Sequence, residues 1–147
     1  MPIKETLQEW ARDRGYRFAT APVSLLNDVR RSLEQRRNSG EIDPDFFRGN
    51  LAFFKYLDGT AMGNPVSIIL IAVPRPAHVL TFSIAGKTTE MLLPPTYVNY
   101  QKMFEDVRDD LSGALAAYGC RLEVLSAPLK ALGNRMGFLK HGRNNIG

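Results

Sequence analysis

The stretch that decides the fold of this 147-residue chain is its longest apolar run, Val66-Ser67-Ile68-Ile69-Leu70-Ile71-Ala72-Val73, which Pro74 closes. A nearly continuous apolar run of this length predicts a strand that is covered on both faces. It is too short to cross a bilayer, which takes about 20 residues in a helix. We therefore expect this run to be the central strand of a sheet in a soluble protein.

Further strand signals lie on both sides of this run. Short apolar or alternating segments bounded by Gly and Pro predict strands over residues 16–21, 79–84, 88–93 and 121–125. The segments 79–84 and 88–93 flank a turn at Gly86 and are expected to pair in antiparallel fashion. The chain would then hold about five strands.

Helical periodicity fills the remaining segments. Apolar residues recur at helical spacing over residues 2–14, through Leu25, Leu26, Val29 and Leu33, and over residues 96–118. Asp43-Pro44-Asp45 opens a phenylalanine-rich helix that we expect to be buried on more than one side, and Ser126 is expected to cap a last helix. The predicted fold class is α/β or α+β, a mixed sheet packed with helices.

Composition predicts one domain, because a single core serves about 100 to 200 residues and 44% of the chain is hydrophobic. Residues 1–110 hold 14 basic and 14 acidic side chains, whereas residues 111–147 hold five basic ones and only Glu123. The net charge of +4 therefore belongs to the last quarter, which favours a phosphate-bearing ligand, RNA or an acidic partner. Its basic residues are Arg121, Lys130, Arg135, Lys140 and Arg143.

The motifs of well-known catalytic sites are missing from the sequence. It contains no P-loop, G-x-S-x-G, H-E-x-x-H or C-x-x-C pattern, and its histidines are His78 and His141. Cys120 is the single cysteine, which excludes an intrachain disulfide or a site built from several thiolates. The charged N-terminus lacks the apolar core of a signal peptide, so we expect a cytoplasmic protein with no membrane partner.

Two segments carry binding signals. In 92–100, a double proline precedes Tyr97 and Tyr100, whose rings are predicted to line one wall of a pocket. In the C-terminal segment, a helix start at Ser126, Ala127 and Pro128 offers backbone N–H groups. The turn that follows offers a flexible backbone, a guanidinium and two side-chain amides; its residues are Gly142, Arg143, Asn144 and Asn145. Such groups suit a polar ligand with phosphate and amide functions.

These C-terminal motifs, S-A-P-L-K at 126–130 and G-F-L-K-H-G-R-N-N-I at 137–146, resemble the epoxyqueuosine reductase family of iron–sulfur proteins. The likeness is closest to a double-cluster branch with Y-G-R-N-N, where this chain has His141 for the tyrosine. The resemblance implies a distantly nitroreductase-like N-terminal domain and a ferredoxin-like C-terminal domain with two [4Fe-4S] clusters. The resemblance also implies a corrinoid (cobalamin) held between these two domains.

The resemblance also assigns roles. The resemblance implies that the residues of the two C-terminal motifs contact the cofactor. The residue pattern of 92–100 adds Tyr97 and Tyr100 to these predicted contacts. The acid that the family places before S-A-P is Leu125 here, and a leucine delivers no proton. Because the cluster cysteines would follow residue 147, we expect an N-terminal part of a longer iron–sulfur oxidoreductase, inactive in redox turnover alone.

Two alternatives of other classes stay open. In the first, the chain is a non-catalytic module whose basic C-terminal quarter docks RNA or a partner domain. In the second, the nitroreductase likeness indicates a flavin-binding reductase-like domain. Salt-sensitive RNA binding would favour the first alternative, and a yellow preparation would favour the second.

Overall fold

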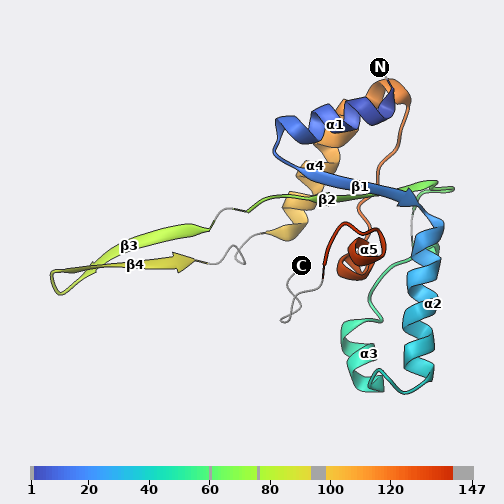
Figure 1. Cartoon of the computed structure of the whole chain (residues 1–147), viewed down its shortest axis with the longest axis horizontal. Helices are drawn as coiled ribbons and strands as arrows, with labels where there is room; N and C mark the ends of the chain where they lie inside the picture. Colours follow the sequence, from blue (N-terminus) through green and yellow to red (C-terminus); the bar gives the residue numbers. More distant parts are fainter. Residues whose placement is uncertain (1, 60, 76, 94–98, 141–147) are drawn as a thin grey trace. The chain divides into compact units, whose positions relative to one another are not determined.

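The computed structural model describes residues 2–59, 61–75, 77–93 and 99–140, and combines helices with strands (Figure 1). The chain divides into two compact units, each assembled from two separate segments: Met1–Tyr16 with Val73–Cys120, and Arg17–Ala72 with Arg121–Gly147. In the described residues the strands form two separate two-stranded antiparallel sheets. The general α+β class is therefore confirmed.

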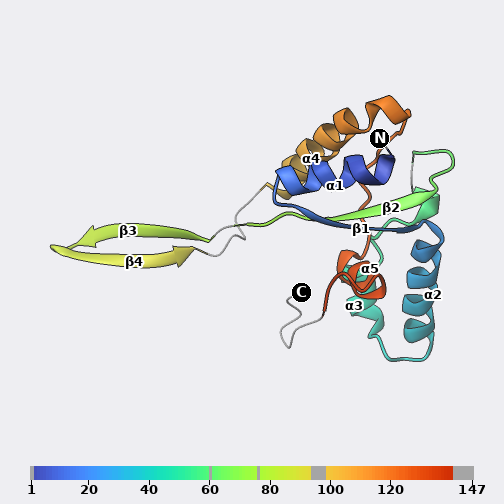
Figure 2. The ribbon, with the colours of Figure 1, turned by 45° about the horizontal axis from the view of Figure 1, so that its top comes forward.

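The first unit is built around two helices, α1 (Ile3–Asp13) and α4 (Tyr100–Ala114), which lie side by side in Figures 1 and 2. A one-turn helix η2 (Ala116–Tyr118) follows α4, and Gly119 then ends the helical segment with a φ of 63°. Asn99 caps α4, because its side chain accepts a hydrogen bond from the Lys102 N–H at 3.1 Å. The predicted helices over 2–14 and 96–118 are thus confirmed within the described residues.

An apolar stripe and a polar cluster join these two helices. Their buried apolar residues are Leu7, Trp10, Ala11 and Leu111, together with Leu115 just after α4. Trp10 donates its indole N–H to Asp110 Oδ2 at 2.9 Å, and Arg14 donates Nη2–H to Asp110 Oδ1 at 2.7 Å. The Arg14 guanidinium also lies 5.4 Å from the centre of the Trp10 ring.

The same unit contains the predicted hairpin. Strand β3 (His78–Ile84) pairs with β4 (Lys87–Leu93) from His78 opposite Leu93 to Ile84 opposite Lys87. The connecting residues Ala85 and Gly86 both have positive φ, at 51° and 78°. Positive φ at both central residues is the requirement of a type I′ hairpin turn.

The second unit packs helices around a short antiparallel pair. Strand β1 (Arg17–Pro22) pairs with β2 (Ser67–Ala72) along six residues. The remaining elements are α2 (Ser24–Asn38), α3 (Pro44–Asn50), the one-turn helix η1 (Leu57–Gly59) and α5 (Leu129–Arg135). The buried core joins α2 to α5 and consists of Leu26, Val29, Ala127 and Leu132. Leu25 and Leu33 pack against it, as the helical spacing predicts.

The predicted five-stranded sheet is not observed. In the described residues β2 pairs with β1 alone, and Leu70 is its one buried residue, so β2 is not a central strand covered on both faces. Val66, expected at the start of that strand, is 79% exposed. An apolar run supplies the side chains for a buried strand, but the number of neighbouring strands depends on distant parts of the chain.

The strand expected over residues 121–125 was also wrong, because this segment is irregular. This segment contacts the loop at residues 61–62 through a side chain and not through the backbone hydrogen bonds of a strand. The Glu123 carboxylate accepts hydrogen bonds from the N–H groups of Ala61 and Met62 at 3.1 and 3.0 Å. The Ser126 carbonyl, just after this segment, accepts a hydrogen bond from the Lys55 N–H at 2.7 Å.

The phenylalanine-rich helix begins as predicted but is not buried. The Asp43 carboxylate caps α3 by accepting from the N–H groups of Asp45 and Phe46 at 3.0 and 2.8 Å. The helix ends at Asn50 and contains no buried residue, and Phe46 is 53% exposed. The prediction of a buried helix was wrong, because a helix of seven residues is too short to place all the phenylalanine side chains of this segment against a core.

Candidate functional site

The predicted cofactor contacts fall into two groups. Tyr97, Gly142, Arg143, Asn144 and Asn145 lie outside the described residues. The described members are Tyr100 in the first unit and Ser126, Ala127 and Pro128 in the second unit. Each unit is therefore considered by itself.

Tyr100 is the first residue of α4, and its side chain is about half exposed. Its ring lies on that of Phe104 one turn later, with 6.3 Å between ring centres and 30° between their planes. This pair presents an aromatic surface at the start of α4. The pocket wall predicted from two tyrosines stays a prediction, since Tyr97 is outside the described residues.

The S-A-P segment has two structural residues and one that faces solvent. Ala127 and Pro128 are buried, and Ala127 belongs to the core with Leu26 and Leu132. Ser126 is exposed, and its carbonyl is held by the Lys55 N–H. The expected Ser126 cap was wrong, because Pro128 directly precedes α5 and no side chain caps that helix. Among these three residues, the Ser126 hydroxyl is therefore the polar side chain available to a ligand.

The far end of α5 holds the start of the second motif. The Gly133 carbonyl accepts hydrogen bonds from the N–H groups of both Phe138 and Leu139, at 2.8 and 3.0 Å. A Cβ on Gly133 would lie 2.5 Å from Leu139 Cδ1, so any larger residue at this position would displace the Leu139 side chain. The Arg17 guanidinium lies 5.5 Å from the centre of the Phe138 ring. These contacts fix the backbone that leads into residues 141–147.

The first motif therefore begins before one short helix, and the described start of the second motif, residues 137–140, follows it. Ser126–Pro128 precedes α5, and the turn at Gly137 follows it, so a helix of about 10 Å separates them. The sequence predicted a helix between the motifs, carrying Leu129 and Leu132 and ending near Gly137, but it did not predict the elements that pack against this helix.

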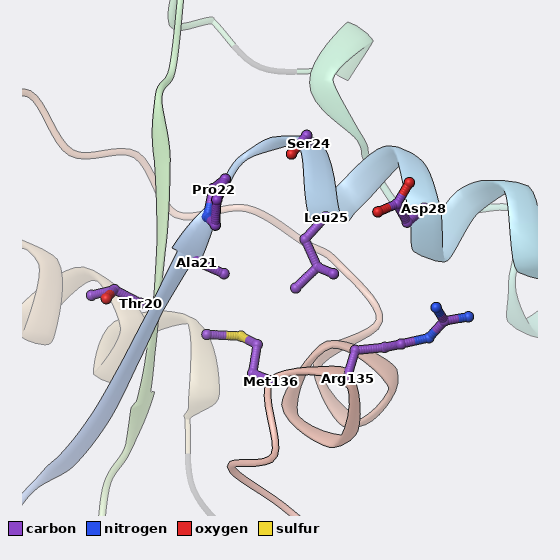
Figure 3. Close-up of a pocket in the computed structure, with 8 residues that line it drawn as sticks. All are labelled: Thr20, Ala21, Pro22, Ser24, Leu25, Asp28, Arg135 and Met136. Carbon is purple, nitrogen blue, oxygen red and sulfur yellow. The ribbon is translucent and has the colours of Figure 1, made fainter.

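A groove of about 340 Å³ opens beside the end of α5 (Figure 3). Three elements line it: the end of β1, the first turns of α2 and the end of α5. Its residues are Thr20, Ala21, Pro22, Ser24, Leu25, Asp28, Arg135 and Met136. Leu25 and Met136 form its apolar middle, and Arg135 extends along the side where Asp28 lies.

The polar groups of this groove favour an anionic or amide-bearing ligand. Arg135 is exposed and forms no ion pair with any residue that the structure describes. The first turn of α2 contains no acidic residue, and no side chain caps it at Val23. The Leu26 N–H bonds the Val23 carbonyl at 3.0 Å, whereas the N–H groups of Ser24 and Leu25 have no such backbone partner among the described residues and carry partial positive charge. The Asp28 carboxylate is paired with Arg31 on the same helix, which reduces its repulsion of an anion.

Sequence reasoning found only part of this groove. Arg135 was named within the basic C-terminal quarter, but the residues from β1 and α2 carried no motif. Their common location depends on how α2 packs on α5, so no local signal in the sequence would have found them.

The described residues contain no group of three or more His, Cys, Asp and Glu side chains that would hold a metal ion. Cys120 is half-buried, with its sulfur 4.0 Å from the Tyr118 carbonyl oxygen. No helix in the described part of the chain is long and apolar enough to cross a membrane.

Comparison with known proteins does not identify the chain. No protein-family model, curated protein or solved structure matches it significantly. The residues of the two C-terminal motifs and their surroundings in the second unit are therefore the basis for assigning a function.

Proposed function

We propose that this chain is the cofactor-binding part of a corrinoid-dependent iron–sulfur oxidoreductase. Within that class, we propose that it belongs with the proteins that resemble epoxyqueuosine reductase and that its corrinoid is cobalamin. The clusters and the redox turnover then belong to a ferredoxin-like domain that follows residue 147. The single observation that supports the proposal is that the first motif and the described start of the second, residues 137–140, flank α5, whose last residue, Arg135, lines a groove.

The groove fits one part of a corrinoid better than the whole. Its volume of about 340 Å³ is at the low end for small-molecule sites, which span about 300 to 1,000 Å³. It would receive a phosphate or amide side arm, with Arg135 and the first turn of α2 as donors and Leu25 and Met136 as apolar contacts. When bound, the corrinoid supplies a cobalt centre for electron transfer.

The position before S-A-P argues against proton delivery from that site. Leu125 is partly buried and packs against the core that contains Leu26 and Ala127. An apolar side chain used for packing has no proton to donate. The proposed role of this chain is therefore to bind and orient the cofactor, and Leu125 argues against epoxyqueuosine as its substrate, because the family's proton donor is missing.

An anaerobic titration with cob(II)alamin tests the proposal. Absorbance and calorimetry should show one corrinoid bound per chain. Arg135→Ala should weaken binding roughly tenfold, as expected for loss of one charged hydrogen bond. Arg121→Ala, which removes an exposed charge outside the groove, is the matched control and should leave affinity within about twofold. A double variant, Arg143→Ala with Asn144→Ala, tests the second motif in the same way.

Flavin mononucleotide serves as the comparison ligand. Tight flavin binding without corrinoid binding would replace this proposal by the flavin-reductase alternative. Equal losses in Arg135→Ala and Arg121→Ala would show a general charge effect and exclude the groove as the binding site.

RNA or partner docking is the second candidate function, and it rests on the exposure of the basic C-terminal quarter. The side chains concerned are Arg121, Lys130, Arg135 and Lys140. Phosphate contacts release counterions, so RNA affinity should fall steeply with salt concentration. Strong RNA binding at low salt, without corrinoid binding, would favour this function.

A further inference from the structure

The second unit carries an arginine–aromatic pair near the groove. The guanidinium of Arg17, the first residue of β1, lies 5.5 Å from the centre of the Phe138 ring. Arg17 is exposed and forms no ion pair with any residue that the structure describes. Planar bases stack both on guanidinium planes and on aromatic rings. We call Arg17 and Phe138 the stacking pair.

The backbone holds both members of the stacking pair in position. Arg17 lies opposite Ala72 in the β1–β2 pairing. Just after α5, the Phe138 N–H donates a hydrogen bond to the Gly133 carbonyl at 2.8 Å. A site whose groups are already in position loses less conformational freedom when a ligand binds. The stacking pair is therefore a preformed surface for a planar ring.

The stacking pair and the groove are neighbours on two segments of the chain. Met136 lines the groove (Figure 3), and Phe138 follows two residues later, a stretch that spans at most about 7 Å. On β1, Arg17, Ala19 and Ala21 point to the same side, because the side alternates along a strand. Ala21 lines the groove, and Ala19 adds only a methyl group between it and Arg17. The two sites thus form one surface along β1.

Unpaired cations border this surface. Arg17, Arg135 and Lys140 are exposed, and none of them forms an ion pair within the described part of the chain. The one carboxylate among the groove residues, Asp28, is paired with Arg31. Arginine binds phosphate through paired, charge-assisted hydrogen bonds. The surface therefore offers a stacking position for a planar ring and, next to it, a cationic position for a phosphate.

We propose that the stacking pair and the groove together bind one planar base that is linked to a phosphate. The base stacks on Arg17, the phosphate lies in the groove beside Arg135, and the sugar that joins them passes Ala19. The nucleotide tail of cobalamin has this chemistry, because it joins a benzimidazole base to a phosphate through a ribose. This assignment rests on the proposed corrinoid function and names the part of the corrinoid that the groove receives.

A comparison of two corrinoids tests the assignment. Cob(II)inamide has the corrin ring of cob(II)alamin but lacks the base, the ribose and the phosphate. In anaerobic calorimetry the wild-type chain should bind cob(II)alamin at least about tenfold more tightly than cob(II)inamide. Arg17→Ala should weaken cob(II)alamin binding about tenfold and leave cob(II)inamide binding within about twofold. Arg135→Ala should show the same pattern, because both residues contact only the tail.

Arg37→Ala is the matched control. Arg37 is also exposed, forms no ion pair with a described residue, and lies 4.8 Å from the centre of an aromatic ring, that of Phe47. It belongs to the same unit but does not line the groove. Its replacement removes the same charge and the same kind of contact, and should leave both affinities within about twofold. Unchanged cob(II)inamide binding also shows that each variant is folded.

The outcomes separate this assignment from the proposed function. Equal affinities of the wild-type chain for the two corrinoids would overturn the tail site and leave corrinoid binding in place. Equal losses of both corrinoids in Arg17→Ala would also overturn it. Failure of both corrinoids to bind would overturn the assignment together with the proposed function.

Adenosine monophosphate distinguishes a free nucleotide from the corrinoid tail. It carries a base and a phosphate without a corrin ring, so it should compete weakly with cob(II)alamin and leave cob(II)inamide binding unchanged. Tight binding of adenosine monophosphate without corrinoid binding would overturn the assignment to cobalamin and identify a free nucleotide as the ligand.

Discussion

The helix pair α1–α4 and the hairpin β3–β4 belong to the same unit and both carry a strong apolar pattern. In the helix pair, Leu7, Trp10 and Leu111 are buried, and Asp110 ties the two helices through Trp10 and Arg14. In the hairpin, Ile84 and Leu92 are each 65% exposed. A helix can bury its stripe against one other helix, whereas a two-stranded ribbon cannot cover either of its own faces.

The largest expected effect comes from removing a buried leucine of the helix pair. Leu111→Ala should lower the free energy of unfolding by about 3 kcal/mol, since it loses burial and leaves a cavity. Leu80→Ala, in the hairpin, should change it by less than about 0.5 kcal/mol in dilute solution. Urea unfolding of both variants measures the contrast. A comparable loss for Leu80→Ala at low concentration would mean that the hairpin is covered within the monomer.

The polar link between the helices should contribute less. Asp110→Asn removes the charge that Arg14 pairs with and should lower the free energy of unfolding by about 1 kcal/mol, because the pair is partly exposed. Asp109→Asn is the control, since Asp109 lies on the same helix and pairs only with its neighbour Arg108 among the described residues. The two variants should differ in urea midpoint, and identical midpoints would exclude a structural role for the Asp110 cluster.

The same cluster predicts a dependence on pH. Hydrogen bonds from Arg14 lower the pKa of Asp110 below its usual value, and the bond from Trp10 acts in the same direction. A carboxyl with a lowered folded pKa stabilises the protein above its unfolded pKa of about 4 and loses that contribution as pH falls further. The stability difference between wild type and Asp110→Asn should therefore be constant near neutral pH and vanish in acid. A difference that grows on acidification would contradict this assignment.

The smallest expected effect concerns the hairpin turn. Ala85 has a φ of 51°, which a residue with a Cβ adopts at a cost, whereas Asn tolerates this region. Ala85→Asn should stabilise the hairpin by about 0.5 to 1 kcal/mol, seen as slower amide exchange in β3 and β4. Ala85→Val should have the opposite effect. Faster exchange in Ala85→Asn would show that the turn differs from the one described.

The sequence predicted much of the local structure and little of the sheet. The helix over 2–14, the Asp43 cap, the hairpin around Gly86 and the helix end at Gly119 all depend on neighbours a few residues away. The expected central strand and the strand over 121–125 failed because pairing joins distant segments. For the candidate site, sequence supplied Ser126 and Arg135 but not the groove walls from β1 and α2.

The sequence by itself determined the Asp43 helix start and the Gly119 helix end, the location of the net charge, and the two C-terminal motifs, because capping, periodicity and composition are local properties. Only the tertiary structure decided that Ala127 is a core residue, that β1 and α2 line a groove with the end of α5, and that Leu80 and Met91 of the hairpin are exposed. The physical reason is that burial and strand pairing depend on which distant segments meet, and this choice is made by the packing of the whole unit.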